Sequence, residues 1–487
     1  MYDKFDTVII GAGPAGCAAG MTLVYAGRKC IILDKLDRPG GLSRSIQRSG
    51  CTFDVGPHRF FTKSNEVLSM WRSILKDDLI MVDRLTRILY KGKLFNYPLS
   101  PINALFGLGV GTSVRAFASY GLRRARLAIQ PRKPVSFEDW VADNFGLVLY
   151  EAFFKHYTEK VWGIPCAEIS ADWASQRIKG LSLFRAVYNS LTKHSGSRIK
   201  TLVDRFLYPR CGAGTLYERM IDQIVTNGSM YVPGATVTRV YRETNHWTVE
   251  FTGTSGDHHE IVCKHLLSSA PLTELLDMLS PAAPDEIISA AASLSFRNHY
   301  CVNLIIKGKT NLFPDNWIYV HSPEQHMGRI ANFANFSSEL PRGDGVFPVT
   351  VEFFSSTGDA VDVMSDEERI DLATKELKQV GFLNSSHQLE DAFVVFSESA
   401  YPVIAKGYER HVTAIKGYLR TLEGLHPMGR AGLFQYNNQD HSVMTGILAA
   451  RNVLGGHYDV WSVNEDAEYL ESGTAPDLCD RDREYGA

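Results

Sequence analysis

Residues 7–20 read TVIIGAGPAGCAAG, and this stretch decides the fold. An apolar strand runs into three glycines, Gly11, Gly13 and Gly16, and the residues after them are typical of a helix. A second apolar strand follows at residues 30–33. The order of strand, glycine turn, helix and strand predicts a βαβ unit, and hence an α/β domain with a parallel sheet.

The three glycines have separate roles. Gly11 permits the tight turn, Gly13 lets the backbone approach a pyrophosphate, and Gly16 allows close packing of the helix. The phosphates are expected at the amino end of the helix, where unpaired N–H groups and the helix dipole favour negative charge. Asp34 lies 23 residues after Gly11, where a carboxylate can accept hydrogen bonds from ribose hydroxyls. The stretch therefore predicts a dinucleotide site.

A second glycine-rich element follows the acid. Arg38-Pro39-Gly40-Gly41 leads to Gly56-Pro57-His58-Arg59. This layout resembles the second phosphate-binding loop, and the strand that passes the isoalloxazine, of the glutathione-reductase-like flavoprotein superfamily. The chain has no second complete GxGxxG unit, so a separate NAD(P)H domain is not expected. The resemblance implies non-covalent FAD bound to a glutathione-reductase-like Rossmann domain.

Composition narrows the class of protein. A chain of 487 residues is longer than one hydrophobic core usually supports, so two domains are expected. Its net charge of −3 gives no general attraction to nucleic acid. Eight cysteines without CxxC or metal-like spacing fit a reduced, cytoplasmic compartment and predict no metal site. We expect no signal peptide and no transmembrane segment, because prolines and glycines interrupt the longest uncharged stretch, Leu94–Val114. A basic cluster leaves open a solvated helix face or weak contact with phosphates or a membrane surface: Arg123, Arg124, Arg126, Arg132 and Lys133.

The pattern of elements predicts a discontinuous FAD-binding domain with an inserted substrate domain of mixed sheet and helices. The FAD-binding domain is expected at 1–65, 205–270 and 425–460, the substrate domain and helical insertion at 66–204 and 271–424, and a polar tail at 472–487. Three further expectations concern single elements. Residues 65–205 read as helical, residues 261–268 as one strand, and the last helix as starting at Ser442.

Longer motifs resemble the amine oxidase and protoporphyrinogen oxidase branch of that superfamily, and also UDP-galactopyranose mutase. Residues 56–62 (GPHRFFT) and 157–163 (YTEKVWG) are similar to mutase motifs. Residues 208–214 (YPRCGAG) and 268–271 (SSAP) instead resemble oxidases and desaturases. The segment beginning at 429 (GRAGLF) is similar to the closing FAD motif of the superfamily.

The resemblance implies a cofactor site assembled from these motifs. The expected FAD contacts are Gly11, Gly13, Pro14, Ala15, Gly16, Asp34, Lys35, Gly41, Leu42, Ser43, Gly56, Pro57, His58, Arg59, Val237, Gly429, Arg430, Asp440, Ser442 and Val443. Asp440 is expected to reach a ribityl hydroxyl, and the helix after it to direct N–H groups at the flavin N1/C2 carbonyl. Val237 is expected to hold the adenine through its backbone.

The resemblance also implies residues that face the flavin. His58, Arg59 and Arg329 are the candidate catalytic residues, and the candidate substrate contacts are Arg177, Tyr97, Tyr157, Trp162 and Tyr319. A guanidinium can bind phosphate oxygens in pairs, or it can form a structural ion pair. Aromatic rings at these positions fit either a stacked substrate or the core.

Two reactions therefore stay open. The oxidase-like motifs imply an FAD-dependent oxidoreductase that transfers a hydride from a small substrate to flavin N5. The mutase-like motifs imply a nucleotide-sugar enzyme that uses reduced FAD without net redox change. A flavin-binding protein with a structural role is a third reading, and a homodimer is compatible with all three. Fold alone does not decide among them.

Overall fold

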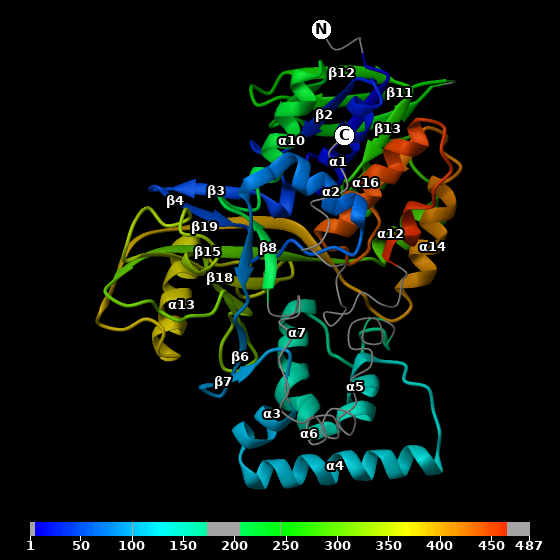
Figure 1. The fold of residues 1–487 in the computed structure, drawn as a ribbon. Helices are drawn as coiled ribbons and strands as arrows, with labels where there is room; N and C mark the ends of the chain where they lie inside the picture. Colours follow the sequence, from blue (N-terminus) through cyan, green and yellow to red (C-terminus); the bar gives the residue numbers. More distant parts are fainter. Residues whose placement is uncertain (1–4, 100, 172, 174–204, 244, 465–487) are drawn as a thin grey trace.

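The computed structural model describes residues 5–99, 101–171, 173, 205–243 and 245–464. Figure 1 shows three parts: a sheet with helices at one end, a large sheet in the middle and a group of helices at the other end. Arg177 and the predicted polar tail lie outside the described residues.

A parallel sheet forms the first part, in the strand order β20-β13-β1-β2-β9. Its strands are β1 (Thr7–Ile10), β2 (Cys30–Asp34), β9 (Met230–Pro233), β13 (His265–Ser268) and β20 (Leu425–Pro427). Helices α1 (Pro14–Tyr25), α10 (Thr215–Thr226) and α16 (Gln439–Val453) pack around it. The sheet thus unites three distant stretches of chain, and the predicted α/β class is confirmed.

Glycines let the backbone segments of this part touch. Gly11 has a φ of +93°, and a Cβ added at Gly16 would lie 1.8 Å from the Gly11 carbonyl oxygen. A Cβ added at Gly446 in α16 would lie 2.0 Å from the carbonyl oxygen of Ala15 in α1. Helices α1 and α16 therefore meet without a side chain between them at this point.

The central part is a seven-stranded sheet in the order β19-β15-β18-β17-β16-β6-β7. Its strands are β6 (Thr86–Tyr90), β7 (Lys93–Asn96), β15 (Phe296–Gly308), β16 (Trp317–Val320), β17 (Arg329–Asn332), β18 (Val346–Ser355) and β19 (His387–Pro402). Helix α13 (Asp366–Gln379) packs against β15 and β19. A second apolar core, which includes Val302, Ile330 and Leu377, fills the space between this helix and the sheet.

The prediction that residues 65–205 are helical holds at α2 (Asn65–Leu75) but was wrong for residues 79–96, which contain three strands. Strands β6 and β7 form a hairpin that joins the central sheet, and β5 (Leu79–Asp83) pairs with β8 (Arg205–Pro209). Lys91 and Gly92 both have positive φ angles, as a two-residue hairpin turn requires. This turn and the pairing of β6 with β16 outweighed the apparent helical pattern.

Two predicted boundaries were also wrong. The expected strand 261–268 is two strands of different sheets, β12 (His258–Cys263) and β13, because the chain leaves one sheet at Lys264 and enters the other. The last helix begins at Gln439 rather than at Ser442, since Asn438 is extended and its N–H donates to the His441 side chain at 3.2 Å. Asp440 and Ser442 therefore both lie in the first turn of α16.

The third part consists of helices, of which α4 (Val110–Ile129) is long and the others are short. They are α3 (Pro101–Leu108), α4 (Val110–Ile129), α5 (Phe137–Phe145), α6 (Leu147–Tyr150), a π-helical turn (Glu151–Lys155) and α7 (His156–Trp162). The buried Lys160 ammonium donates to the carbonyl oxygens of Val320, Ser322 and Met327 at 2.8–3.2 Å, which ties α7 to the central sheet. No helix in the described residues is long and apolar enough to cross a membrane.

The remaining elements connect these parts. They are α2 (Asn65–Leu75), α11 (Leu272–Met278), α12 (Asp285–Ala292), α14 (Tyr408–Leu419), α15 (Gly429–Gly432), β3 (Ser45–Arg48), β4 (Cys51–Asp54), β10 (Thr236–Arg242), β11 (Trp247–Thr252) and β14 (Leu279–Ser280). Strands β10, β11, β12 and β14 form a small sheet beside the parallel one. The division of the chain into domains at the predicted boundaries stays a prediction.

Substituting Gly16→Ala is expected to lower the free energy of unfolding by about 2–3 kcal/mol, because the new methyl group meets a backbone oxygen that cannot move aside. Urea unfolding measures this change. Gly121→Ala is the matched control, since nothing lies within 4 Å of a Cβ on this exposed helical glycine. It should be neutral or stabilising by up to about 1 kcal/mol. Equal effects of the two substitutions would contradict the packing argument.

Candidate active site

One continuous cavity of about 1150 Å³ connects the three parts of the molecule. It begins at the glycine turns of Gly13 and Gly41, passes Arg430 and Arg329, and ends among Phe145 and other apolar side chains of the helical part. Ligand pockets usually measure about 300–1,000 Å³, so this cavity has room for a large cofactor and a substrate together.

The outer end of the cavity is built from backbone. A Cβ added at Gly41 would lie 3.1 Å from the Cα of Gly13, so the two glycine turns face each other directly. Helix α1 has no side-chain cap and no acidic residue in its first turn, which leaves its amino end available to an anion. Arg44 lines the same region and donates to the Gly41 carbonyl at 2.8 Å. These features suit a pyrophosphate.

Asp34 lies beside these turns. Its carboxylate accepts hydrogen bonds from the N–H groups of Ala12 and Leu36, and burial raises its pKa. Val237 and Glu274 line the cavity nearby, and Lys35 forms an exposed ion pair with Glu398 at 3.5 Å. These residues suit an adenosine site, in which a carboxylate accepts hydrogen bonds from ribose hydroxyls.

The closing motif forms the middle of the cavity. The Arg430 Nε donates to the Asn437 carbonyl at 2.7 Å, and its guanidinium lies 5.1 Å and 5.2 Å from the ring centres of Tyr401 and Tyr436. Asp440 and Ser442 line the cavity from the first turn of α16. The amino end of a second helix therefore also faces the cavity.

Several buried polar atoms on the cavity wall have no hydrogen-bond partner among the described residues. They are Asn437 Oδ1, Gln439 Nε2, Ser397 Oγ, His321 Nδ1, Trp173 Nε1 and Trp317 Nε1. Buried polar groups in native proteins nearly always have a partner. A polar ligand that fills the cavity would supply one, so the residues present fit an elongated cofactor such as a flavin dinucleotide.

His58 borders the cavity as a neutral ring. Its Nε2 lies 2.8 Å from the Leu42 carbonyl oxygen and 3.2 Å from that of Val55, so the proton is on Nε2 and Nδ1 is the acceptor. Burial lowers the pKa of His58 to about 4, and the positive charges of Arg329 and Arg430 act in the same direction. The ring fixes the loop of Gly56 and Pro57 beside the first glycine turns.

Arg329 is held by a buried carboxylate. Its Nε donates to Glu352 Oε1 at 2.8 Å, and its Nη2 donates to Glu352 Oε2. Burial alone would raise the pKa of Glu352, but Arg329 and His299 outweigh it and hold that pKa at about 2. Gly56 permits this arrangement, since a Cβ there would lie 3.0 Å from Glu352 Oε2. Arg329 therefore stays charged and points into the cavity in one orientation.

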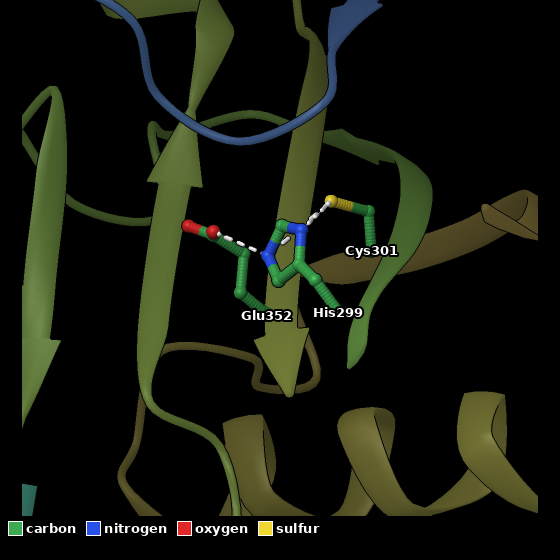
Figure 2. Close-up of side chains that lie close together, drawn as sticks. All are labelled: His299, Cys301 and Glu352. Atoms are coloured by element: carbon green, nitrogen blue, oxygen red, sulfur yellow. Dashed lines mark hydrogen bonds and ion pairs between the residues drawn. The ribbon is translucent and has the colours of Figure 1, made fainter. Parts of the chain in front are cut away.

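Figure 2 shows the His299 ring between Glu352 and Cys301. The His299 Nε2 lies 2.8 Å from Glu352 Oε2, and the His299 Nδ1 lies 3.9 Å from Cys301 Sγ. A His-Cys-Glu group of this kind could in principle hold a metal ion. Here the carboxylate already accepts from the Arg329 guanidinium, whose charge opposes a second cation. Burial raises the pKa of Cys301 well above its ordinary value, which disfavours the thiolate that a metal needs. We interpret the group as the support of Arg329.

Aromatic rings surround the inner part of the cavity. Tyr319 lies 5.0 Å from Tyr97 and 5.4 Å from Tyr157, and the Tyr157 ring stacks on His321 at 4.7 Å. Trp162 contacts Tyr436 at 5.5 Å between ring centres. Tyr97, Tyr157 and Tyr319 thus form one connected aromatic wall, and Trp162 lines the same cavity beside Tyr436. We use the name inner chamber for the region lined by His58, Arg59, Tyr157, Tyr319, Arg329, Tyr401, Arg430 and Tyr436.

The structure brings nearly all of the predicted site residues to this cavity. Gly16, Gly56 and Val443 do not line it, although each lies next to a residue or segment that does. Arg177 falls outside the described residues. The lining residues that sequence reasoning did not select include Arg44, His321, Tyr401 and Tyr436. Arg44 directly follows the second glycine turn, which was an available signal, whereas Tyr401 comes from the far end of a long strand that no motif marks.

The sequence model of the family described as flavin containing amine oxidoreductase matches residues 14–454. The chain belongs to this family of flavoproteins, and it is an FAD-binding enzyme of the flavin amine oxidase type.

Three individual proteins are similar to this chain. The solved structure of a reduced UDP-galactopyranose mutase is similar with a TM-score of 0.80 at 22% identity, over 96% of this chain and 97% of that one. A Klebsiella pneumoniae protein named "Probable UDP-galactopyranose mutase" is 30% identical over 34% of this chain and 43% of its own length. A phytoene dehydrogenase of Streptomyces griseus is 24% identical over 53% of this chain and 52% of its own. The aligned parts thus span about half or less of these curated relatives.

Substituting Glu352→Gln is expected to lower the free energy of unfolding at pH 7 by about 3 kcal/mol, because it leaves the buried Arg329 charge without its counterion. The pKa of Glu352 is about 2 in the folded protein and 4.5 ordinarily, so its ionised form stabilises the fold above pH 4.5. This contribution is lost as the pH falls from 4.5 towards 2.

Urea unfolding of both proteins between pH 7 and pH 3 measures the effect. The difference between them should be largest at pH 7 and shrink below pH 4.5, because there the Glu352 carboxylate takes up a proton in the unfolded wild-type chain while it stays ionised in the folded protein. Glu390→Gln is the control, since Glu390 pairs with Arg342 nearer the surface and should matter by less than about 1 kcal/mol. A pH-independent difference would contradict the role given to the ionised carboxylate.

Proposed function

We propose that the protein is an FAD-dependent oxidoreductase that takes two electrons and a proton from a C–H bond of an anionic small substrate. The observation that carries this proposal is the charge of the inner chamber. Arg59, Arg329 and Arg430 line it, whereas the carboxylates among the described lining residues lie elsewhere. Asp34, Glu274 and Glu398 are at the adenosine end, and Asp440 is at the start of α16.

This charge distribution selects among substrates. An amine substrate would enter as a cation and would meet the guanidinium groups of Arg59, Arg329 and Arg430, of which Arg329 has its counterion in Glu352 behind it. A carboxylate or phosphate would instead gain hydrogen bonds from the outer edge of an arginine that is already oriented, since Glu352 holds Arg329 through Nε and Nη2. Because Glu352 already holds Arg329 in the folded protein, binding an anion there does not carry the usual entropic cost of ordering an arginine side chain. A negatively charged substrate fits this chamber better than an amine does.

The residues of the chain would share the work in the following way. Bound FAD supplies a two-electron acceptor that the protein must orient against the substrate. The aromatic wall of Tyr157 and Tyr319 holds the apolar part of the substrate and excludes water. Arg329 fixes its anionic group. His58 has a neutral ring with its acceptor nitrogen at Nδ1, and it would accept at that atom the proton that a substrate hydroxyl releases as the hydride leaves the adjoining carbon. Because its pKa is lowered to about 4, His58 would pass this proton on rather than keep it.

A second candidate function is a nucleotide-sugar reaction without net redox change, as in UDP-galactopyranose mutase. It is favoured by the similarity to a mutase structure over nearly the whole chain and by the two arginines, Arg329 and Arg430, that flank the chamber. A diphosphate would satisfy both guanidinium groups. Arg177, which the resemblance assigns to a diphosphate, belongs to this alternative.

A panel of substrates should separate these reactions. The purified yellow protein is mixed without oxygen with amines, hydroxy acids, phosphorylated sugars and UDP- or dTDP-sugars, and flavin absorbance is recorded. Bleaching by an anionic compound, with no response to amines, is the expected result. Bleaching by amines alone would contradict the anionic site. Conversion of a sugar nucleotide only after dithionite treatment, with no bleaching, would replace the oxidoreductase proposal with the mutase.

Substituting Arg59→Gln should raise KM for the anionic substrate found in this way by about tenfold, the equivalent of one charge-assisted hydrogen bond. The value of kcat should change less than threefold, if Arg59 binds the anionic group and does not act on the reacting bond. Steady-state kinetics measures both. Arg72→Gln in the exposed face of α2 is the control and should leave KM unchanged. An unchanged KM in the Arg59→Gln protein would remove this residue from the site.

A further inference from the structure

Helix α4 belongs to a stretch of unusual charge. Residues 84–137 contain ten lysines and arginines and no aspartate or glutamate, although the whole chain has a net charge of −3. Helix α4 lies across the end of the molecule opposite to α1, with the short helices on one side of it only (Figure 1). Its position and its charge raise the question of what its outer face meets.

The outer face of α4 is apolar. Val110, Leu122 and Ile129 are 83%, 74% and 80% exposed, and Val114 and Phe117 are exposed beside them. At 100° per residue these side chains fall on one broad side of the helix. The opposite side carries Ala116, Tyr120, Arg123 and Leu127, which are buried or half-buried on the neighbouring helices. A surface helix normally turns its apolar side inward, so the outer stripe is a second apolar face that nothing in the described chain covers.

Arginines border this stripe on both sides. Arg124 lies along one edge, and Arg115 and Arg126 lie along the other. They form no ion pair within the described residues, and all three are exposed. Arg123 behaves differently: it turns inward and pairs with Asp143 at 2.7 Å. Within the described residues, the arginines of α4 without an ion pair are therefore the three that flank the apolar stripe.

We propose that α4 is a membrane-docking helix that lies in the plane of an anionic lipid surface. Its apolar stripe enters the boundary between headgroups and acyl chains, and its flanking arginines meet the lipid phosphates. An exposed apolar face between cationic edges is the pattern of helices that lie on membranes rather than cross them. The complementarity is of charge as well as of polarity, because the headgroups are negative and the stretch carries no acid to repel them.

Other partners fit this face less well. Nucleic acid would use the arginines but would leave the apolar stripe in water. A second copy of the chain would bring the same positive edges against each other in a symmetric contact. An anionic bilayer satisfies both features at once.

The placement of α4 fits this proposal. Helix α4 packs on α3, α5 and α6, and the same three helices carry Ala104, Phe145 and Leu149 into the apolar end of the cavity. The docking face and the apolar end of the cavity are thus separated by one layer of helices. A substrate with an apolar tail could pass between a bilayer and the chamber at this end. This last step depends on the proposed function, whereas docking itself does not.

Vesicle sedimentation with the FAD-loaded full chain tests the docking. We expect binding to vesicles of phosphatidylglycerol and phosphatidylcholine in equal parts, at least tenfold weaker binding to pure phosphatidylcholine, and loss of binding in 0.5 M salt, at which charge interactions are strongly screened. The triple variant Arg115→Gln, Arg124→Gln, Arg126→Gln should lose about fivefold in affinity for each arginine removed. Val114→Ser with Phe117→Ser should weaken binding by at least tenfold.

Val363→Ser is the matched control, because Val363 is 72% exposed on a different part of the molecule. It should bind vesicles as the wild type does. Flavin content and melting temperature of each variant report whether it is folded, and activity on a water-soluble substrate separates docking from the reaction. Binding that survives both α4 variants, or equal binding to neutral vesicles, would overturn the proposal. So would a dimer, detected by sedimentation velocity, that is lost in the α4 variants while the wild type ignores vesicles.

Discussion

The structure depends on the close approach of backbone to backbone around the start of α1. Gly16 allows the helix to lie against the Gly11 carbonyl, Gly41 faces Gly13 across the cavity, and Gly446 brings α16 onto Ala15. A side chain at Gly446 would separate two helices that lie more than 400 residues apart in the sequence, and a side chain at Gly16 or Gly41 would force apart the glycine turns themselves. Because they touch, two helix amino ends face the same cavity, and the phosphates and the ring system of one cofactor can be held by both. The same glycine contacts therefore build both the dinucleotide site and the packing of helices on the parallel sheet.

The second organising interaction is electrostatic. The Arg329–Glu352 pair is buried in the central sheet, so its charges are costly unless each satisfies the other. His299 completes the group from the neighbouring strand β15. The result is one guanidinium of fixed orientation at the border between the cofactor part and the helical part.

The sequence predicted the cofactor half of the site far better than the substrate half. The reason is that the cofactor residues lie close together in the sequence. The glycines near Gly11 and Gly41 and the acid Asp34 act within a few residues of one another, so spacing alone carries their meaning. Tyr401 and Glu352, in contrast, reach the chamber only through the register of β19 and β18 against β15. That register is fixed by long-range pairing, which a motif cannot express. The hairpin of β6 and β7 was missed for the same reason, since its helical appearance is overridden by pairing with β16.

The π-helical turn at Glu151–Lys155 has a consequence for how this cavity can change. It inserts an extra residue between α6 and α7, so that neighbouring side chains such as Phe153 and Phe154 both line the cavity. Loss of a single codon here would turn Tyr157 and everything after it by about 100° around the helix axis. The aromatic wall would then present other rings to the same flavin. A length change in this one turn would therefore change which side chains line the inner cavity and leave the nucleotide-binding scaffold as it is.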